Sequence, residues 1–390
     1  MLLFEQAFKI VLNSAYMTGT ERIDIAGAKD RILAEDIISD MSMPPFDKSA
    51  VDGYACRRAE LADELTVIET VPAGVSPTLP VGPNQCVKIM TGAEIPNGAD
   101  CVVMVEFTKR TSENKIRFTG VKTADNICFL GEDIRAGEVV LSKGLLLKPQ
   151  CIATLACAGC VNPLVAKKPR VGIITTGSEL VPPSEKPGKA QIRDSNSCQL
   201  YAHASSIADA RSYGIVSDAK DQIDSTLKKA MEENDVILLS GGVSMGDYDF
   251  VTEVLKQNGV DILFDKIAVK PGKPTVFGVR GKKLYFGLPG NPVAAFVIFE
   301  LLIRPFLYKM MGHDYKPVYT VVPLEESVKI KNTERQLWLP VAITQAGTVK
   351  CVGYHGSAHI SSLCGADGLI SVDIGVAEIE RTTPVCVRLI

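Results

Sequence analysis

The chain of 390 residues has little of what several common protein classes require. It contains one tryptophan and four histidines, none in an HExxH arrangement, which argues against a catalytic zinc site. Its net charge of −3 and pI near 5.9, without a Lys/Arg run among aromatics, argue against a nucleic-acid surface. No segment approaches the about 18 uninterrupted apolar residues of a membrane span, and the N-terminus lacks the basic start of a signal peptide. We therefore expect a cytoplasmic protein with no nucleic-acid and no membrane partner.

The eleven cysteines do not form a pattern that indicates disulfides or zinc. Their number is odd, and all stand singly except Cys157 and Cys160, which form a lone CxxC. This CxxC lies in an apolar stretch with no second CxxC and no nearby histidine. We therefore expect its two cysteines to be buried as small hydrophobic residues.

The familiar phosphate-binding motifs GxxxxGK[ST] and GxGxxG are also missing, which argues against a P-loop enzyme and a dinucleotide fold. In their place, Asp235–Val251 reads DVILLSGGVSMGDYDFV: an apolar strand, a glycine-rich turn and an acid-opened helix. Such a turn binds anions through its backbone N–H groups. Asp247 and Asp249 add carboxylates that hold Mg²⁺ beside a phosphate. The alternative is a tight turn with capping aspartates; two glycines, two serines and two acids favour a ligand site.

The apolar pattern changes along the chain and predicts several parts. Residues 1–16 have helical spacing, residues 20–147 read as short strands and loops, and a second helix is expected from Pro149 to about Ala158, packed beside the first. Residues 169–312 alternate strands and helices, with helices expected at 196–210 and 292–312, which predicts a mostly parallel sheet covered on both faces. Short strands return after Pro317. In such sheets, ligands bind at the carboxyl ends of the strands.

Other candidate site residues lie in turns of this α/β region. Glu179, in TTGSEL, follows its first strand, whereas Asp194-Ser195-Asn196 by itself indicates no more than a helix cap. Lys270 and Lys273 lie three residues apart in KPGKP, a stiff loop that would bring two positive charges to an anion. The segment LPGNP (288–292) joins a strand to a helix and is too rigid for a mere linker, although by itself it indicates no chemistry. PPFDKSAVDGY (44–54) and Gly131-Glu132-Asp133 are further candidates, for which composition alone leaves a structural turn equally open.

Taken together, these segments resemble the molybdopterin molybdenumtransferase family, which includes MoeA and the C-terminal domain of gephyrin. The resemblance covers essentially the whole chain. The segments that carry it occur in the family's order: PPFDKSAVDGYA, IMTGAEIPNGADCVVMVE, GEDI, TTGSEL, DSNS, SGGVSMGDYD, KPGKP and GLPGNPV.

The family implies a multidomain α/β plus β fold in four parts. These are a small helical base (1–19 and 138–168), an inserted elongated β-rich module (20–137), a MogA-like three-layer α/β/α domain (169–316) and a C-terminal β-barrel (317–390). It also implies a homodimer with the active site at the interface, and transient contact with a MogA-type adenylyltransferase. The implied reaction inserts molybdenum from molybdate into adenylylated molybdopterin, with release of AMP and help from Mg²⁺.

The resemblance also assigns roles to individual residues of this sequence. The catalytic residues would be Asp52, Asp133, Glu179 and Asp249, and the residues that bind Mg²⁺ would be Glu179, Asp247 and Asp249. The residues that bind the substrates would be Thr91, Asp194, Asp218, Ser240, Gly241, Gly242, Ser244, Lys270, Lys273, Pro289, Pro292, Arg335 and Ser357.

Two departures from the family pattern and two rival functions remain. Cys128-Phe129-Leu130 stand where many members have arginines, and Ala294 stands where many have serine. The α/β region alone also fits a MogA-like molybdopterin adenylyltransferase, although the β-rich module and the C-terminal strands argue against it. A non-enzymatic scaffold is the second alternative.

Overall fold

The computed structural model describes residues 1–242, 250–353, 356 and 358–390. It divides the chain into two compact units. Unit 1 contains Met1–Glu21, Asp30–Ala34 and Leu164–Ile390, and unit 2 contains Arg22–Lys29 and Glu35–Pro163. The four domain boundaries expected from the sequence stay a prediction. Across the described part of the chain, helices are too short or too polar to cross a membrane.

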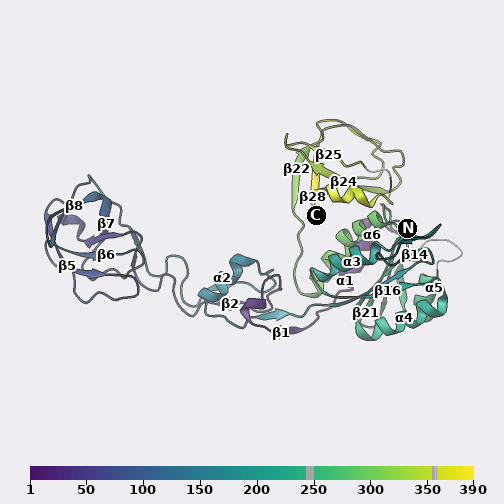
Figure 1. Cartoon of the computed structure of the whole chain (residues 1–390), viewed down its shortest axis with the longest axis horizontal. Coiled ribbons are helices and arrows are strands. Elements are labelled where there is room, and N and C mark those ends of the chain that lie inside the picture. The colour runs from purple at the N-terminus through teal and green to yellow at the C-terminus, as the bar shows by residue number, and fades with distance from the viewer. Residues whose placement is uncertain (243–249, 354–355, 357) are drawn as a thin grey trace. The chain divides into compact units, whose positions relative to one another are not determined.

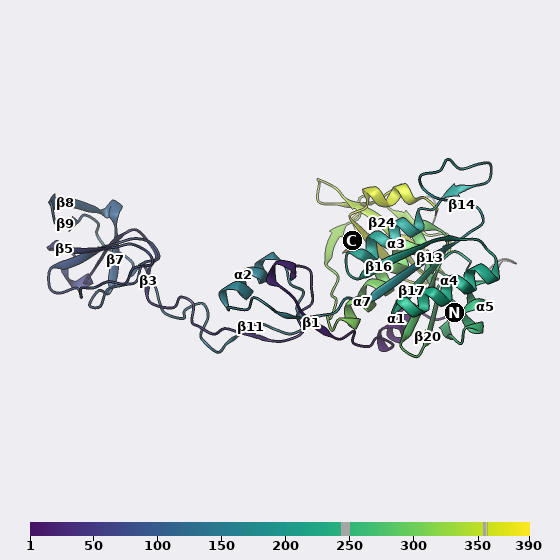
Figure 2. The same ribbon diagram turned by 60° about the horizontal axis from the view of Figure 1, so that its bottom comes forward.

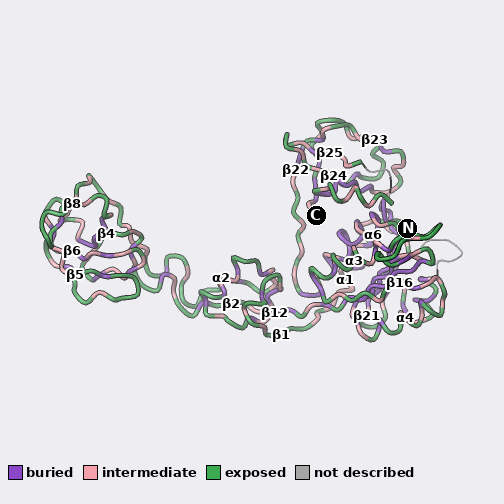
Figure 3. Tube along the Cα trace, viewed as in Figure 1, coloured by how far each residue is buried: buried purple, intermediate pink, exposed green. Residues whose placement is uncertain are grey.

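The α/β part of unit 1 is built on one sheet (Figure 1). In it β16, β13, β17 and β21 run parallel, and β20 runs antiparallel to both of its neighbours, β21 and β18. The central strands are apolar and almost wholly buried (Figure 3). This mostly parallel sheet was predicted. In spatial order the strands are β16 (Asp209–Val216), β13 (Arg170–Thr176), β17 (Val236–Ser240), β21 (Lys283–Leu288), β20 (Val276–Arg280) and β18 (Asp261–Phe264).

Helices cover both faces of this sheet (Figures 1 and 2). α4 and α5 pack together over one apolar face, and α3 packs with α6 over the other. α1 contacts α7. The sequence suggested that α1 would pack beside α2, but the two helices belong to different units. The helices of this part of unit 1 are α1 (Phe4–Asn13), α3 (Asn196–Ser205), α4 (Lys220–Glu233), α5 (Val251–Gln257), α6 (Pro292–Ile298) and α7 (Arg304–Met310), with a π-helical turn, η4 (Phe299–Ile303), between the last two.

Four elements differ from the sequence-based prediction. The helix expected over residues 196–210 ends at Ser205, and β16 begins at Asp209. β16 and β18, which the sequence did not reveal, are the two edge strands. Exposed polar residues interrupt the apolar run of β16, and β18 is only four residues long. The single helix expected over 292–312 is interrupted by η4.

Glu300, within η4, is a charged residue in an apolar segment, and two side chains stabilise it there. Its side chain is 4% exposed, and Arg304 Nε lies 2.9 Å from each of its carboxylate oxygens. His203 Nδ1 lies 3.3 Å from Oε1. Burial alone would raise the pKa of Glu300, but hydrogen bonds from His203 and Arg304 outweigh it and lower the pKa from 4.5 to about 2.

Replacing Glu300 with glutamine should therefore destabilise the protein in a pH-dependent way. Because the folded-state pKa is lowered, the carboxylate stabilises the fold fully above about pH 4.5, and this contribution is lost as the pH falls toward 2. We expect a loss of about 3 kcal/mol at pH 7. Urea unfolding of both proteins at pH 7, 5 and 4 tests this; a difference that does not shrink below pH 4.5 would contradict it.

The C-terminal part of unit 1 is a β domain around its own apolar core, with one short helix, η5 (Ile360–Gly365). Its main sheet also includes β19 (Val269–Lys270), which carries the first lysine of KPGKP and pairs with β24. The other strands are β22 (Tyr319–Pro323), β23 (Val328–Lys329), β24 (Gln336–Ile343), β25 (Val349–Cys351), β26 (Gly368–Val372), β27 (Glu378–Ile379) and β28 (Pro384–Leu389).

Short paired strands complete unit 1 and its junctions with unit 2. β14 pairs with β15, and β1 pairs with β12. Their bounds are β14 (Leu180–Val181), β15 (Ile192–Arg193), β1 (Thr20–Arg22) and β12 (Leu164–Ala166).

Unit 2 holds the β-rich module, a twisted sheet in the order β7-β4-β6-β5-β9-β8 with an apolar core on each face. The strands of unit 2 are β2 (Ile37–Ile38), β3 (Lys48–Ser49), β4 (Gly53–Cys56), β5 (Glu64–Val71), β6 (Gln85–Ile89), β7 (Cys101–Met104), β8 (Thr108–Ser112), β9 (Lys115–Phe118), β10 (Ile127–Cys128) and β11 (Val139–Leu141). Its helices are η1 (Ile25–Gly27), η2 (Arg58–Glu60), η3 (Val105–Phe107) and α2 (Pro149–Cys157).

The cysteines of the lone CxxC are not buried as the sequence suggested. Cys157 is exposed and Cys160 is half-buried, because they lie at and beyond the end of α2, where only Cys151 and Leu155 point into the core.

Candidate functional site

A cavity of about 760 Å³ opens at the carboxyl ends of β13, β17 and β21. The strands are in parallel register there, with Thr175 opposite Ser240 and Ser240 opposite Leu288. The three turns that follow these strands therefore converge on one place. This is the position that the α/β pattern predicted for a ligand.

The cavity collects most of the site residues expected in the α/β region. Those that line it are Glu179, Asp194, Asp218, Ser240, Gly241, Gly242, Pro289 and Pro292. Ala358 and Ile360 line it from the C-terminal β domain. The sequence pointed to their neighbour Ser357 but not to these two residues. Ser244, Asp247, Asp249 and Ser357 lie outside the described residues.

The glycine turn after β17 has no room for a side chain. Gly241 has a φ of +91°, and a Cβ there would lie 2.3 Å from the carbonyl oxygen of Thr176. Gly242 has a φ of +63°, and its Cβ would lie 2.9 Å from Thr176 Oγ1. Both observations require glycine, because other residues adopt this backbone conformation at a cost and would collide with β13. The turn is thus held tightly against the end of the neighbouring strand.

Asn196, which the sequence ranked no higher than a helix cap, connects the turns around the cavity. Its Nδ2 donates to Ser240 Oγ at 2.8 Å and to the carbonyl oxygen of Gly290 at 2.8 Å. Asp194 does act as a cap, accepting from the Ser197 backbone N–H at 3.0 Å. The only hint in the sequence was an asparagine just after a strand–turn segment. Its two hydrogen-bond partners lie 44 and 94 residues away along the chain, so a local pattern could not identify them.

Buried polar atoms without a partner gather at the same cavity. Among the described residues, Thr175 Oγ1, Thr176 Oγ1 and Asn196 Oδ1 are buried with no hydrogen bond. Such atoms are rare in folded proteins and call for a ligand or a water molecule as partner. An amide oxygen can only accept a hydrogen bond, so the unpartnered Oδ1 of Asn196 calls for a donor. The cavity is therefore prepared for a ligand with hydrogen-bond donors.

Replacing Asn196 with aspartate should weaken both stability and ligand binding. The shape is nearly unchanged, but the two N–H donors are lost, and a second acidic group is placed beside Asp194. We expect about 2 kcal/mol less stability. Thermal unfolding of N196D measures this effect, with S195A, a change at a half-buried neighbour, as the control. Equal melting temperatures for N196D and the wild type would show that these bonds do not hold the turns.

Carboxylates stand at the rim of the cavity. Asp218 Oδ2 accepts from the Ser178 backbone N–H at 2.8 Å, which fixes the TTGSEL turn to the end of β16. Glu179 is exposed, and its carboxylate lies over Gly177, so that a Cβ on that glycine would come within 2.8 Å of Oε2. The rim thus presents oxygen ligands next to the glycine turn.

The KPGKP loop reaches the cavity through Pro274. Lys270 is half-buried and Lys273 is exposed; neither is among the residues that line the cavity. Arg335 comes close to this loop, since its Nη1 donates to the carbonyl oxygen of Val269 at 3.4 Å. The loop, the arginine and the cavity therefore belong to one region of unit 1, whereas an oxyanion between the two lysines stays a prediction.

The expected site residues of the β-rich module lie in unit 2. Thr91 donates to Asp52 Oδ1 from both its backbone N–H and its hydroxyl, each at 2.7 Å. These two hydrogen bonds, from the hydroxyl first, lower the pKa of Asp52, which favours a charged carboxylate. Asp133 is exposed and its backbone N–H donates to Met43. The structure thus brings Asp52 and Thr91 together.

Comparison with known proteins finds matches for three consecutive regions of the chain. Residues 2–159 match the MoeA N-terminal region (domain I and II), residues 172–309 a probable molybdopterin binding domain, and residues 322–390 the MoeA C-terminal region (domain IV). The molybdopterin molybdenumtransferase of Bacillus subtilis (strain 168) is 35% identical over 99% of this chain and 93% of its own length. The chain belongs to the molybdopterin molybdenumtransferase family.

Further relatives agree with this family membership. The molybdopterin molybdenumtransferase of Staphylococcus epidermidis (strain ATCC 12228 / FDA PCI 1200) is 34% identical over 95% of this chain and 91% of its own length. The crystal structure of a molybdopterin biosynthesis MoeA protein from Pyrococcus horikoshii OT3 is similar with a TM-score of 0.86, at 32% identity and complete coverage of both chains. The family and the fold class expected from the sequence are thereby confirmed.

The cavity can now be placed within the family's regions. Its lining from Thr175 to Pro292 falls inside the part that matches the probable molybdopterin binding domain, and Ala358 and Ile360 fall inside the MoeA C-terminal region.

Proposed function

We propose that the protein is a molybdopterin molybdenumtransferase that inserts molybdenum from molybdate into adenylylated molybdopterin and releases AMP. The observation that carries the proposal is the cavity at the strand ends, which lies in the molybdopterin-binding part of the family and combines a glycine turn with rim carboxylates. A volume of about 760 Å³ suits a ligand of this size.

The glycine turn supports binding of the pyrophosphate that joins molybdopterin to AMP. Gly241 and Gly242 bring backbone close to the ligand because they carry no side chain, and turns of this kind bind phosphate through N–H groups. Thr175, Thr176 and Asn196 would bind polar atoms elsewhere on the ligand through their unpartnered side-chain oxygens.

The donors at the rim fit Mg²⁺. Glu179 and Asp218 supply carboxylate oxygens at one cavity, and Mg²⁺ is usually held by one or two carboxylates together with phosphate oxygens and water. Phosphate oxygens of the bound substrate would supply further ligands. Bound Mg²⁺ would neutralise charge on the phosphoanhydride. The residues of this chain position that phosphate, and Asp247 and Asp249 are proposed to assist.

Molybdate is proposed to bind at the KPGKP loop. Lys270, Lys273 and Arg335 supply positive charge near Pro274, which lines the cavity. Molybdate is a doubly charged anion, so fixed cations are the groups that would hold it. Ala294, in place of the serine common in the family, offers no hydroxyl here.

Asp52, Thr91 and Asp133 are proposed to act across a homodimer. Their carboxylate and hydroxyl groups lie in unit 2, and the proposed active site would lie at the interface of the two subunits. We also propose a transient encounter with the MogA-type adenylyltransferase, which would supply the adenylylated substrate.

The proposal is tested by incubating the purified protein with adenylylated molybdopterin, molybdate and Mg²⁺ and measuring AMP. We expect AMP release that requires both molybdate and Mg²⁺. ATP consumption with free molybdopterin would instead favour the MogA-like adenylyltransferase. Binding without either reaction would favour the scaffold.

A further inference from the structure

Three cysteines stand side by side across the sheet of unit 2. Cys56 on β4 is the register partner of Cys101 on β7 and of Cys86 on β6. Opposed residues of neighbouring strands point to the same face. All three side chains are 0% exposed and belong to one apolar core. The proposed function uses none of them.

The sulfurs of Cys56 and Cys101 are already in contact. Their Sγ atoms lie 3.8 Å apart and share a hydrogen bond, and Cys101 Sγ also lies 3.7 Å from the carbonyl oxygen of Cys56. Opposed residues in antiparallel strands have Cα atoms about 4.5 or 5.5 Å apart, and both separations fall within the range found for disulfides. Rotation of the two side chains is therefore enough to close an S–S bond.

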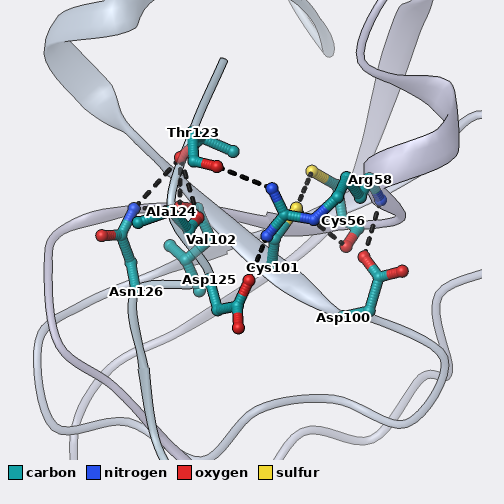
Figure 4. A network of polar contacts seen from close by, with 9 residues as sticks. All are labelled: Cys56, Arg58, Asp100, Cys101, Val102, Thr123, Ala124, Asp125 and Asn126. Atoms are coloured by element: carbon teal, nitrogen blue, oxygen red, sulfur yellow. Dashed lines mark hydrogen bonds and ion pairs between the residues drawn. The ribbon is translucent and has the colours of Figure 1, made fainter.

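A polar network surrounds this pair (Figure 4). The backbone N–H of Arg58, two residues after Cys56, donates to Asp100 Oδ1 at 2.6 Å, next to Cys101. The Arg58 guanidinium donates to the Thr123 carbonyl oxygen at 2.6 Å and to Asp125. Asn126 Nδ2 donates to the Val102 carbonyl oxygen at 2.7 Å. The network ties residues 123–126 to β7, so both cysteine backbones are held in place.

The environment makes the thiols unequal. The hydrogen bond from Cys56 lowers the pKa of the Cys101 thiol, and the Arg58 guanidinium acts in the same direction. Burial raises the pKa of Cys86 to about 12. Since the thiolate is the reactive form, these directions favour Cys101 over Cys86 as the attacking thiol.

We propose that Cys56 and Cys101 are a site of reversible oxidation, at which hydrogen peroxide closes a disulfide between β4 and β7. The oxidant must be small and uncharged because both side chains are fully buried. It would reach them during local opening of the sheet end.

The chemistry is balanced without a further reactant. The Cys101 sulfur attacks one peroxide oxygen, the O–O bond breaks, and the leaving hydroxide takes up the Cys101 proton as water, giving a sulfenic acid. The Cys56 sulfur then attacks the Cys101 sulfur, the S–O bond breaks, and the departing oxygen leaves as water with the Cys56 proton. Two thiols and one peroxide thus yield one disulfide and two waters, and an added dithiol reverses the reaction.

Peptide mapping of the full-length protein tests this proposal. The exposed cysteines are first blocked with iodoacetamide under native conditions, and the protein is then treated with hydrogen peroxide, unfolded in N-ethylmaleimide and digested. We expect a disulfide-linked pair of peptides containing Cys56 and Cys101, which dithiothreitol separates. The oxidised protein should melt roughly 5 °C higher than the reduced one.

Variants of the three cysteines provide matched controls. C86A should still form the linked peptides, whereas C56A and C101A should not. The mapping of the wild-type protein decides the question even if a variant fails to fold. Thiols that stay unmodified at peroxide concentrations that oxidise the unfolded chain, or a Cys56–Cys86 link in equal yield, would overturn the proposal.

Discussion

Gly241→Ala is expected to abolish AMP release almost completely. The added Cβ would lie 2.3 Å from the carbonyl oxygen of Thr176, and the φ of +91° is unfavourable for alanine. The neighbouring atom is backbone at the end of a buried strand, so the turn must move instead. A displacement of about 1 Å at a reacting phosphate costs on the order of 100-fold in rate.

Gly214→Ala is the matched control for this prediction. Gly214, on β16, has a similar φ of +80°, but a Cβ there meets nothing within 4 Å, and Gly214 is not among the residues that line the cavity. G214A should lose about 1 kcal/mol of stability and keep its AMP release. If G241A and G214A released AMP at similar rates, the close contact with Thr176 would have no part in the function.

Glu179→Gln is expected to reduce AMP release by about 100-fold at limiting Mg²⁺. Glutamine keeps the shape of the side chain at the cavity rim but removes the charge that attracts a divalent cation. Because the loss lies in cation binding, higher Mg²⁺ should restore part of the rate. AMP release measured across a range of Mg²⁺ concentrations gives both values.

The control for Glu179 is a nearby acid with no place in the cavity. Glu185 is exposed and is absent from the cavity lining. E185Q should therefore match the wild type at every Mg²⁺ concentration. An E179Q variant with the wild-type Mg²⁺ dependence would remove Glu179 from the proposed metal site.

Much of the fold could be predicted from local patterns. β13, β17 and β21 were recognisable because buried parallel strands are continuous apolar runs, and α4 because its apolar residues recur at helical spacing. β16 was missed because its exposed polar residues break the apolar run, and β18 because its four residues are too few to show a pattern. The π-helical turn contains Glu300, which Arg304 and His203 stabilise. Local spacing did not reveal this turn, since His203 lies almost a hundred residues away along the chain.

The sequence by itself determined the glycine turn and the position of the ligand site at the strand ends, since strand order and backbone freedom follow from nearby residues. Tertiary structure alone decided that Asn196 joins Ser240 to Gly290, that Ala358 and Ile360 reach the cavity, and that Cys56 touches Cys101. The physical reason is that these contacts depend on register and packing between distant segments, which leave no periodic trace in the chain.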